Sequence, residues 1–263
     1  MLRHLLLPLA LLAPLALPTQ GQNVLLLIGD DMGLDRVGAY GVHPQAGPTP
    51  VLDLMAQHGV LFRNCWSNPV CSPTRASMLT GRYGFRTGIG NSVKHSDAEA
   101  YSLPFAEQTL PELLPPQYTS GAVGKWHLGT VTSGDLTHPL LTGFDTHRGA
   151  IANLPADDGE QAYFEWEKAT DGLASTSFVY ATTDTVDEAL ALTETLPEPW
   201  FLWVAFNAPH TPYHKPPGDL HDLTLPAGPA KDSPDLHHRA MTQAMDTEIG
   251  RLVGSMRPAI LAH

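Results

Sequence analysis

The run Trp200-Phe201-Leu202-Trp203-Val204-Ala205-Phe206 is an unbroken apolar stretch of the chain. A continuous apolar run of this length is typical of a strand that is buried on both faces of a sheet. Two further runs, Asn23 to Ile28 and Tyr118 to Val123, resemble it, and helical patterns alternate with all three. This alternation predicts an α/β fold with a mostly parallel central sheet and helices on both faces. The expected helices are Pro50 to His58, Pro73 to Arg82, Thr182 to Leu196 and His238 to Met256.

Polar residues follow each expected strand directly. They read Gly29-Asp30-Asp31, Gly124-Lys125-Trp126-His127 and Asn207-Ala208-Pro209-His210. Ligands of open α/β sheets bind beyond the carboxyl ends of the strands, so we expect these three ends to form one site. The Gly-rich segment from Thr130 to Ser177 is instead expected to form long surface loops.

Asp30 and Asp31 are hard oxygen ligands of the kind that bind Ca²⁺ or Mg²⁺. The alternative is a solvated acidic turn in which Asp31 caps a following helix. Lys125 and His127 lie two residues apart and would point the same way in an extended segment. There they would stabilise negative charge and move a proton, unless they only form a polar strand end. His210 lies between two prolines and could contact an anion or protonate a leaving oxygen, although an ordinary loop histidine is the alternative.

The stretch Cys71-Ser72-Pro73-Thr74-Arg75 opens an expected helix. Pro73 fits the first turn, where its missing N–H costs no hydrogen bond. The free N–H groups and the positive dipole end of such a helix attract an anion or a thiolate, and Arg75 could bind an oxygen of that anion. A simple helix start with a surface arginine is the alternative, and a short-loop disulfide with Cys65 is another.

Composition and charge limit the class of protein. The chain has 263 residues, 43% hydrophobic residues and a net charge of −12, which fit one globular domain and argue against nucleic-acid binding. At the N-terminus, Arg3 precedes an apolar run from Leu5 to Leu17 that Pro8 and Pro14 interrupt. This predicts a signal peptide over residues 1–21 rather than a membrane anchor. We therefore expect an exported protein, periplasmic or extracellular, without a stable membrane anchor.

Together these motifs resemble the sulfatases, a branch of the alkaline-phosphatase-like superfamily. The resemblance covers nearly all of the chain after residue 21 and implies the alkaline-phosphatase-like fold for residues 22–263, as an incomplete N-terminal catalytic domain. The matching stretches are Asn23 to Gly33, Thr49 to Leu54, Cys71 to Tyr83, Gly124 to Gly129, Gly143 to Asp145, Ala208 to Pro212 and Met245 to Leu252.

The resemblance also implies an activity, the hydrolysis of sulfate esters of small molecules or glycans. A formylglycine-generating enzyme would convert Cys71 in the extended chain to formylglycine, whose hydrate has one hydroxyl to attack sulfur and another to expel sulfate. By the same resemblance Cys65 would be a buried structural residue, and Thr74 replaces the serine common in the family. The implied calcium ligands, with Mg²⁺ as the alternative ion, are Asp30, Asp31 and Cys71; the implied lining of the sulfate pocket is Arg75, Lys125, His127 and His210.

The chain departs from the family pattern at its C-terminal end. The family continues into another strand with an Asp-Asn metal-binding pair and a later lysine, whereas this sequence ends at His263. The expectation is a sheet with an exposed edge that lacks the C-terminal part of the fold. Three interpretations stay open: a metal-dependent sulfatase that is either active as written or the front part of a longer enzyme, a catalytically inactive remnant, and a phosphonate monoester hydrolase.

Overall fold

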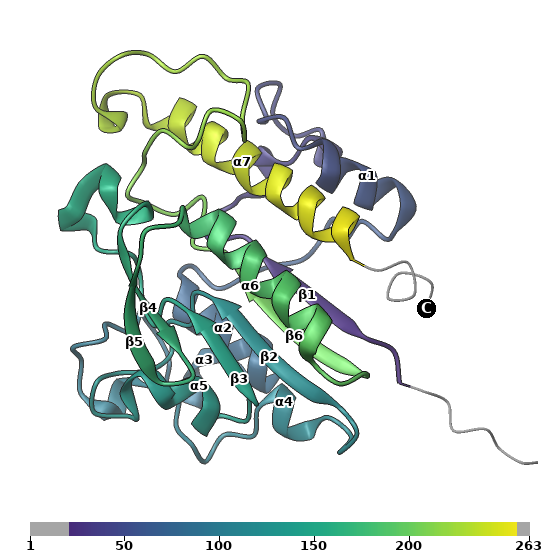
Figure 1. Cartoon of the computed structure of the whole chain (residues 1–263), viewed down its shortest axis with the longest axis vertical. Helices are drawn as coiled ribbons and strands as arrows, with labels where there is room; N and C mark the ends of the chain where they lie inside the picture. The colour runs from purple at the N-terminus through teal and green to yellow at the C-terminus, as the bar shows by residue number, and fades with distance from the viewer. Residues whose placement is uncertain (1–20, 257–263) are drawn as a thin grey trace, which may run out of the picture.

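The computed structural model describes residues 21–256 and contains one mixed six-stranded sheet (Figure 1). Its order is β1-β6-β2-β3-β4-β5; the first four of these strands are mutually parallel, and β4 and β5 are added antiparallel. The strands are β1 (Val24–Ile28), β2 (Thr119–Gly124), β3 (Thr146–Gly149), β4 (Trp166–Thr170), β5 (Leu173–Ser177) and β6 (Trp200–Ala205). The predicted mostly parallel α/β sheet is confirmed.

Strand β6 lies at the centre because both of its faces are apolar. Its six residues are all buried, and they alternate between two hydrophobic clusters on opposite faces of the sheet. One face is covered by α6 (Ala181–Thr195) and α7 (Pro234–Ser255), the latter packed on α1 (Pro50–His58). The other face is covered by α2 (Cys71–Thr80) and the short helices α3 (Gly84–Thr87), α4 (Leu110–Leu113) and α5 (His138–Leu141).

The four expected helices are all present. The helix over Pro50 to His58 has the predicted bounds, whereas α2, α6 and α7 begin one to four residues earlier than expected. A long-range contact ties α1 to α7: the Asp246 carboxylate accepts hydrogen bonds from the backbone N–H groups of Val51 and Leu52, at 3.0 and 2.9 Å. This side chain caps the first turn of α1, whose own preceding threonine makes no capping bond.

The prediction of long surface loops over residues 130–177 is wrong for much of that segment. It contains β3, β4 and β5, and the last two form a hairpin. Asp171 and Gly172 join them with φ angles of 50° and 87°, as a type I′ turn requires. The dipeptide Asp-Gly between two short alternating segments was the available sequence signal.

The predicted burial of Cys65 is also wrong. Cys65 is exposed in the irregular segment between α1 and α2, and both cysteines are free thiols. The expected signal peptide falls almost entirely on residues 1–20, outside the described residues. Within residues 21–256, no helix is long and apolar enough to cross a membrane. In the same part of the chain the outer edge of β1 has no strand partner, as expected for this sheet.

Candidate active site

The ends of three neighbouring parallel strands, β1, β6 and β2, bring the expected site residues together. Strand β6 lies between the other two, and its end is bonded to both. The backbone N–H of Lys125 donates to the Ala205 carbonyl at 2.7 Å, and that of Asp30 donates to the Ala208 carbonyl at 3.0 Å. The carboxylate after β1 and the lysine after β2 therefore meet beyond the end of β6.

Asp30, Lys125 and Arg75 form a buried charged cluster. The Asp30 carboxylate accepts hydrogen bonds from the Lys125 ammonium and, at 3.2 Å, from the Arg75 guanidinium. Arg75 also donates to the Lys125 backbone carbonyl, so one arginine of α2 holds two strand ends. All three side chains are at most 4% exposed. Two cations around one carboxylate leave a net positive charge in the cluster.

The pKa values of this cluster follow from burial and pairing. Burial alone would raise the pKa of the Asp30 carboxyl, but Lys125 and Arg75 outweigh it and lower that pKa below its ordinary value. Burial lowers the pKa of the Lys125 ammonium, and the Asp30 carboxylate opposes the shift. Asp30 is therefore ionised at neutral pH and pairs with both cations.

Cys71 is the first residue of α2 and contacts His127. Its Sγ lies 3.0 Å from Nδ1 of His127 and 3.8 Å from the Ser92 hydroxyl. Burial, with help from Lys125 and Arg75, lowers the pKa of His127 to about 2. The His127 imidazole is therefore neutral at any physiological pH.

Side-chain alternation along an extended segment predicts that Lys125 and His127 point the same way, but the structure brings them together in another way. Strand β2 ends at Gly124, and His127 adopts φ 64°, so the two residues do not lie in an extended segment. The backbone N–H of His127 donates to the Ile151 carbonyl at 2.9 Å, which holds this loop in place. Trp126, between them, points into the core and donates from Nε1 to His138 at 3.0 Å.

Asp31 and His210 form the solvent-facing side of the site. Nε2 of His210 lies 3.6 Å from the Asp31 carboxylate. Nδ1 of His210 is 2.6 Å from the Thr211 carbonyl, which can only accept, so Nδ1 carries a proton. The nitrogen that faces Asp31 is thus the one free to take or give a proton. The Asp31 carboxylate is 57% exposed, in contrast to that of Asp30.

A cavity of about 300 Å³ opens between the end of β1 and the start of α2. Both aspartates, Cys71 and Arg75 line this cavity, together with the segment before α2. Its lining residues are Ile28 to Gly33, Ser67 to Cys71, Thr74 and Arg75. Of the sequence-predicted residues, Lys125, His127 and His210 do not line this cavity, but they contact residues that do.

The donor set at this edge suits a hard cation only in part. Asp30 and Asp31 offer carboxylate oxygens, which Ca²⁺ and Mg²⁺ prefer, but Ca²⁺ takes about six to eight oxygen ligands. Within residues 21–256, no group of three or more His, Cys, Asp or Glu side chains is placed to hold a metal. The two carboxylates can therefore begin a metal shell, and the remaining oxygens must come from water, substrate or protein outside these residues.

The sequence did not reveal the contacts that residues of irregular segments make in the site. Ser92 reaches Cys71 from an irregular segment with no sequence signal for this contact. The Thr74 hydroxyl bonds to the backbone of the segment before α2: it donates to the Val70 carbonyl and accepts from the backbone N–H of Asn68, at 2.9 and 3.0 Å. Threonine at this position therefore fixes the segment before Cys71. His214, which follows the loop of His210, is fully buried and bonded to the Tyr180 hydroxyl at 3.0 Å.

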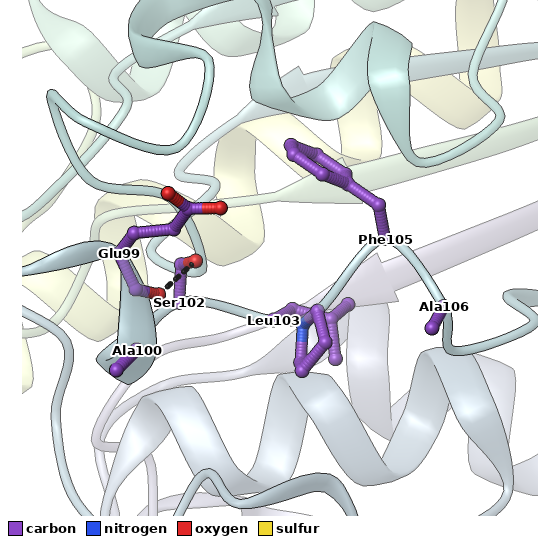
Figure 2. A pocket seen from close by; sticks show the side chains of 7 residues that line it. Glu99, Ala100, Ser102, Leu103, Phe105 and Ala106 are labelled. Carbon is purple, nitrogen blue, oxygen red and sulfur yellow. Dashed lines mark hydrogen bonds between the residues drawn. The ribbon is translucent and has the colours of Figure 1, made fainter.

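A second hollow, of about 540 Å³, shares no residue with the site cavity. Glu99 and Phe105 are among the residues that line it, and in Figure 2 Ser102 and Leu103 lie between these two. The loop that lines this hollow is held by Leu103, whose backbone N–H donates to the Leu128 carbonyl at 2.9 Å. None of the predicted site residues lines it.

Comparison with known proteins gives one family. A family model described as Sulfatase matches residues 22–252. The N-acetylgalactosamine-6-sulfatase of Homo sapiens is 37% identical over 224 residues, which cover 74% of this chain and 41% of that protein. Arylsulfatase J of Mus musculus is 32% identical over 213 residues, covering 75% of this chain and 34% of that protein. The chain thus spans less than half the length of these curated relatives.

Solved structures share the fold. The crystal structure of Ps i-CgsB in complex with k-i-k-neocarrahexaose has a TM-score of 0.74 at 26% identity, covering 89% of this chain and 55% of that chain. The structure of BT4656 in complex with its substrate D-glucosamine-2-N,6-O-disulfate has a TM-score of 0.60 at 20% identity, covering 91% of this chain and 56% of that chain. The second likeness concerns the fold alone.

Proposed function

Because this chain belongs to the sulfatase family, we propose that its site hydrolyses sulfate esters through residue 71. The observation that carries the proposal is the 3.0 Å contact between Cys71 and His127, at a helix N-terminus beside a buried cationic cluster. Transfer of a sulfuryl group passes through a trigonal-bipyramidal transition state whose oxygens carry negative charge, which fixed positive charge and free backbone N–H groups stabilise. This arrangement therefore suits transfer of a sulfuryl group to the side chain at position 71.

Formylglycine, formed from Cys71 by a formylglycine-generating enzyme, would supply a hydroxyl nucleophile with a built-in route for releasing sulfate. His127 is placed to hydrogen-bond that side chain through Nδ1. Its imidazole is neutral because the pocket is buried and cationic, so it orients the group and does not add to the positive charge. A bound sulfate would make proton uptake by His127 easier by offsetting the nearby cations.

Lys125 and His210 have separate roles in this proposal. The Lys125 ammonium keeps positive charge next to residue 71, with which it interacts electrostatically. His210, once protonated at Nε2, is placed at the open side of the site and can give that proton to the departing alcohol oxygen. Arg75 is tied to Asp30 and to the backbone of Lys125, so its role is to hold the cluster together as well as to add charge.

A calcium ion, with magnesium as the alternative, would polarise the sulfate oxygens when bound. Asp30, Asp31 and the modified side chain of Cys71 would hold it, because they lie on one cavity wall. The exposed Asp31 carboxylate is free to turn toward an ion, whereas Asp30 already balances two cations.

For the substrate we propose a sulfated sugar or a small sulfated molecule. The human relative is named for N-acetylgalactosamine, and the Ps i-CgsB structure holds a neocarrahexaose. The cavity opens to solvent on the side of Asp31, which would let a larger alcohol project from the site. We also propose that residues 1–21 are a signal peptide, so that the exported protein begins near Gln22; the intact mass of secreted protein tests this.

The decisive experiment is turnover of an aryl sulfate and of a galactosamine 6-sulfate by the full chain with Ca²⁺. The chain is coexpressed with a formylglycine-generating enzyme, and peptide mass confirms the aldehyde at residue 71. We expect turnover that chelation and Cys71→Ala abolish and that Cys65→Ala, at the exposed free cysteine, leaves intact.

Two outcomes would contradict the proposal. Folded, aldehyde-bearing protein without turnover would make this chain a sulfatase by ancestry only, unable to work without further residues. Faster cleavage of a phosphonate monoester than of the matching sulfate would instead identify a phosphonate monoester hydrolase.

A further inference from the structure

His210 ends a tight turn that is hydrogen-bonded to a buried tyrosine. The turn runs from Asn207 to His210 and is closed by the His210 backbone N–H, which donates to the Asn207 carbonyl at 3.0 Å. The Tyr163 hydroxyl lies 2.8 Å from that Asn207 carbonyl and 2.7 Å from the carbonyl of His210. Both carbonyls can only accept, so one hydroxyl proton is shared between the two ends of the turn.

The same turn is also hydrogen-bonded to the backbone of Asp30, at the end of β1. The Ala208 carbonyl accepts from the backbone N–H of Asp30 at 3.0 Å. The turn is therefore held between the strand end that carries Asp30 and the hydroxyl of Tyr163. The turn cannot move without breaking one of these hydrogen bonds.

Tyr163 is itself immobilised by packing. Its side chain is fully buried, and its ring centroid lies 4.1 Å from that of His214 and 6.0 Å from that of Tyr180. Burial raises the pKa of the Tyr163 hydroxyl well above its ordinary value, so the group remains a donor at any working pH. A donor with no rotational freedom can fix its acceptors more sharply than an exposed one.

We propose that Tyr163 is a positioning residue for His210: its hydroxyl sets the turn so that Nε2 of His210 faces Asp31 and the open side of the site. This inference rests on the proposed function only for its effect on turnover. The Thr211 carbonyl, bonded to Nδ1 of His210, fixes which ring nitrogen carries the proton, and Tyr163 fixes where the ring lies. The two contacts together give the imidazole one orientation and one tautomer.

The test removes a single hydroxyl. In Tyr163→Phe the ring contacts with His214 are retained, and Tyr180→Phe is the matched control, because it also deletes a buried hydroxyl of the same aromatic cluster. The first readout is the ¹⁵N spectrum of histidine-labelled full-length protein, with His210 assigned through His210→Gln. We expect wild-type His210 to show a protonated Nδ1, because that atom bonds to the Thr211 carbonyl. Tyr163→Phe should shift the Nε2 signal, because the ring would no longer be held beside the Asp31 carboxylate.

The second readout is turnover. With the substrate that wild type cleaves, Tyr163→Phe should lower kcat roughly ten- to hundredfold and leave KM within about twofold, because a misplaced proton donor affects the chemical step. In the His210→Gln background the same change should cost no further activity, since Tyr163 acts through His210. Tyr180→Phe should lose stability without these effects.

An unaltered His210 spectrum in Tyr163→Phe would overturn the proposal, and so would an equal change in Tyr180→Phe, which would indicate general loosening. Tyr163→Met, which also lacks the hydroxyl and adds no histidine signal, is expected to displace His210 in the same way and serves where Tyr163→Phe does not fold. A wild-type protein without turnover would contradict the proposed function but not this inference, because the spectra do not depend on activity.

Discussion

Acid should unfold this protein at a pH where most globular proteins are still stable. Burial lowers the pKa of four histidines that are each at most 3% exposed: to about 2 for His127 and to about 4 for His138, His147 and His214. In the unfolded chain each returns to about 6.5. A depressed folded-state pKa means that the stabilising contribution is complete above pH 6.5 and is lost as the pH falls toward the folded value.

The magnitude follows from the difference in proton binding. At pH 5 an imidazole with a folded pKa of about 4 has lost about 2 kcal/mol relative to neutral pH, and His127 has lost about the same. Together the four histidines account for about 8 kcal/mol, against a total stability of about 5–15 kcal/mol for an ordinary domain. Unfolding at pH 5 would take up about 3.6 protons, so stability should fall by about 5 kcal/mol per pH unit there.

Urea unfolding followed by tryptophan fluorescence between pH 7.5 and 5 measures this slope. The variant His147→Gln should reduce the proton uptake at pH 5 by about 0.9, because it removes one buried titrating ring. His58→Gln, at the exposed end of α1, should leave the slope unchanged. An uptake of less than one proton per molecule between pH 6 and 5 would refute the reasoning, because it would mean that these rings are not kept neutral by burial.

Three further changes test the charged cluster and the backbone. Asp30→Asn should cost about 3–5 kcal/mol in urea unfolding, because it leaves two buried cations without their carboxylate, and it should cost more than Lys125→Met, after which the carboxylate keeps the arginine; equal losses would contradict the pairing. Asp246→Ala should cost about 1–2 kcal/mol by the same method through loss of the α1 cap, with an unchanged slope against urea concentration. Gly124→Ala should lower the melting temperature, since φ is 84° and a Cβ there would lie 2.1 Å from the Ala205 carbonyl oxygen; a variant with wild-type melting would show that the loop after β2 can shift.

The sequence was most informative where one physical requirement dominated. A strand buried on both faces needs an unbroken apolar run, so β6 could be predicted almost to the residue from Trp200 onward. A parallel sheet requires the polar residues after neighbouring strands to meet, so the sequence alone predicts that Asp30, Lys125 and His210 lie near one another. The contacts of these residues in the structure agree with that expectation.

Prediction failed where short polar segments depend on tertiary context. Strand β4 pairs with β3 through only two residue pairs, Arg148 with Thr170 and Gly149 with Ala169, and such a short antiparallel addition leaves little periodicity to detect. The exposed position of Cys65 could not be read from its residue type, because cysteine is usually buried. The hydrogen bond from the Tyr163 hydroxyl to the Asn207 carbonyl joins residues that share no sequence motif.

The pairing of β1 with β6 has a consequence for the timing of synthesis. Among the described strands β1 pairs only with β6, so the sheet edge that holds Asp30 against Arg75 cannot form until Trp200 has left the ribosome. Between Cys71 and Trp200 lie roughly 130 residues, which take roughly 6 to 26 s to add at about 5–20 residues per second. For that period the β1 end that carries Asp30, the partner of Arg75 in the Cys71 segment, is not yet fixed by β6. If Cys71 is modified as proposed, strand order gives the modifying enzyme a delay of seconds before this edge of the sheet can form.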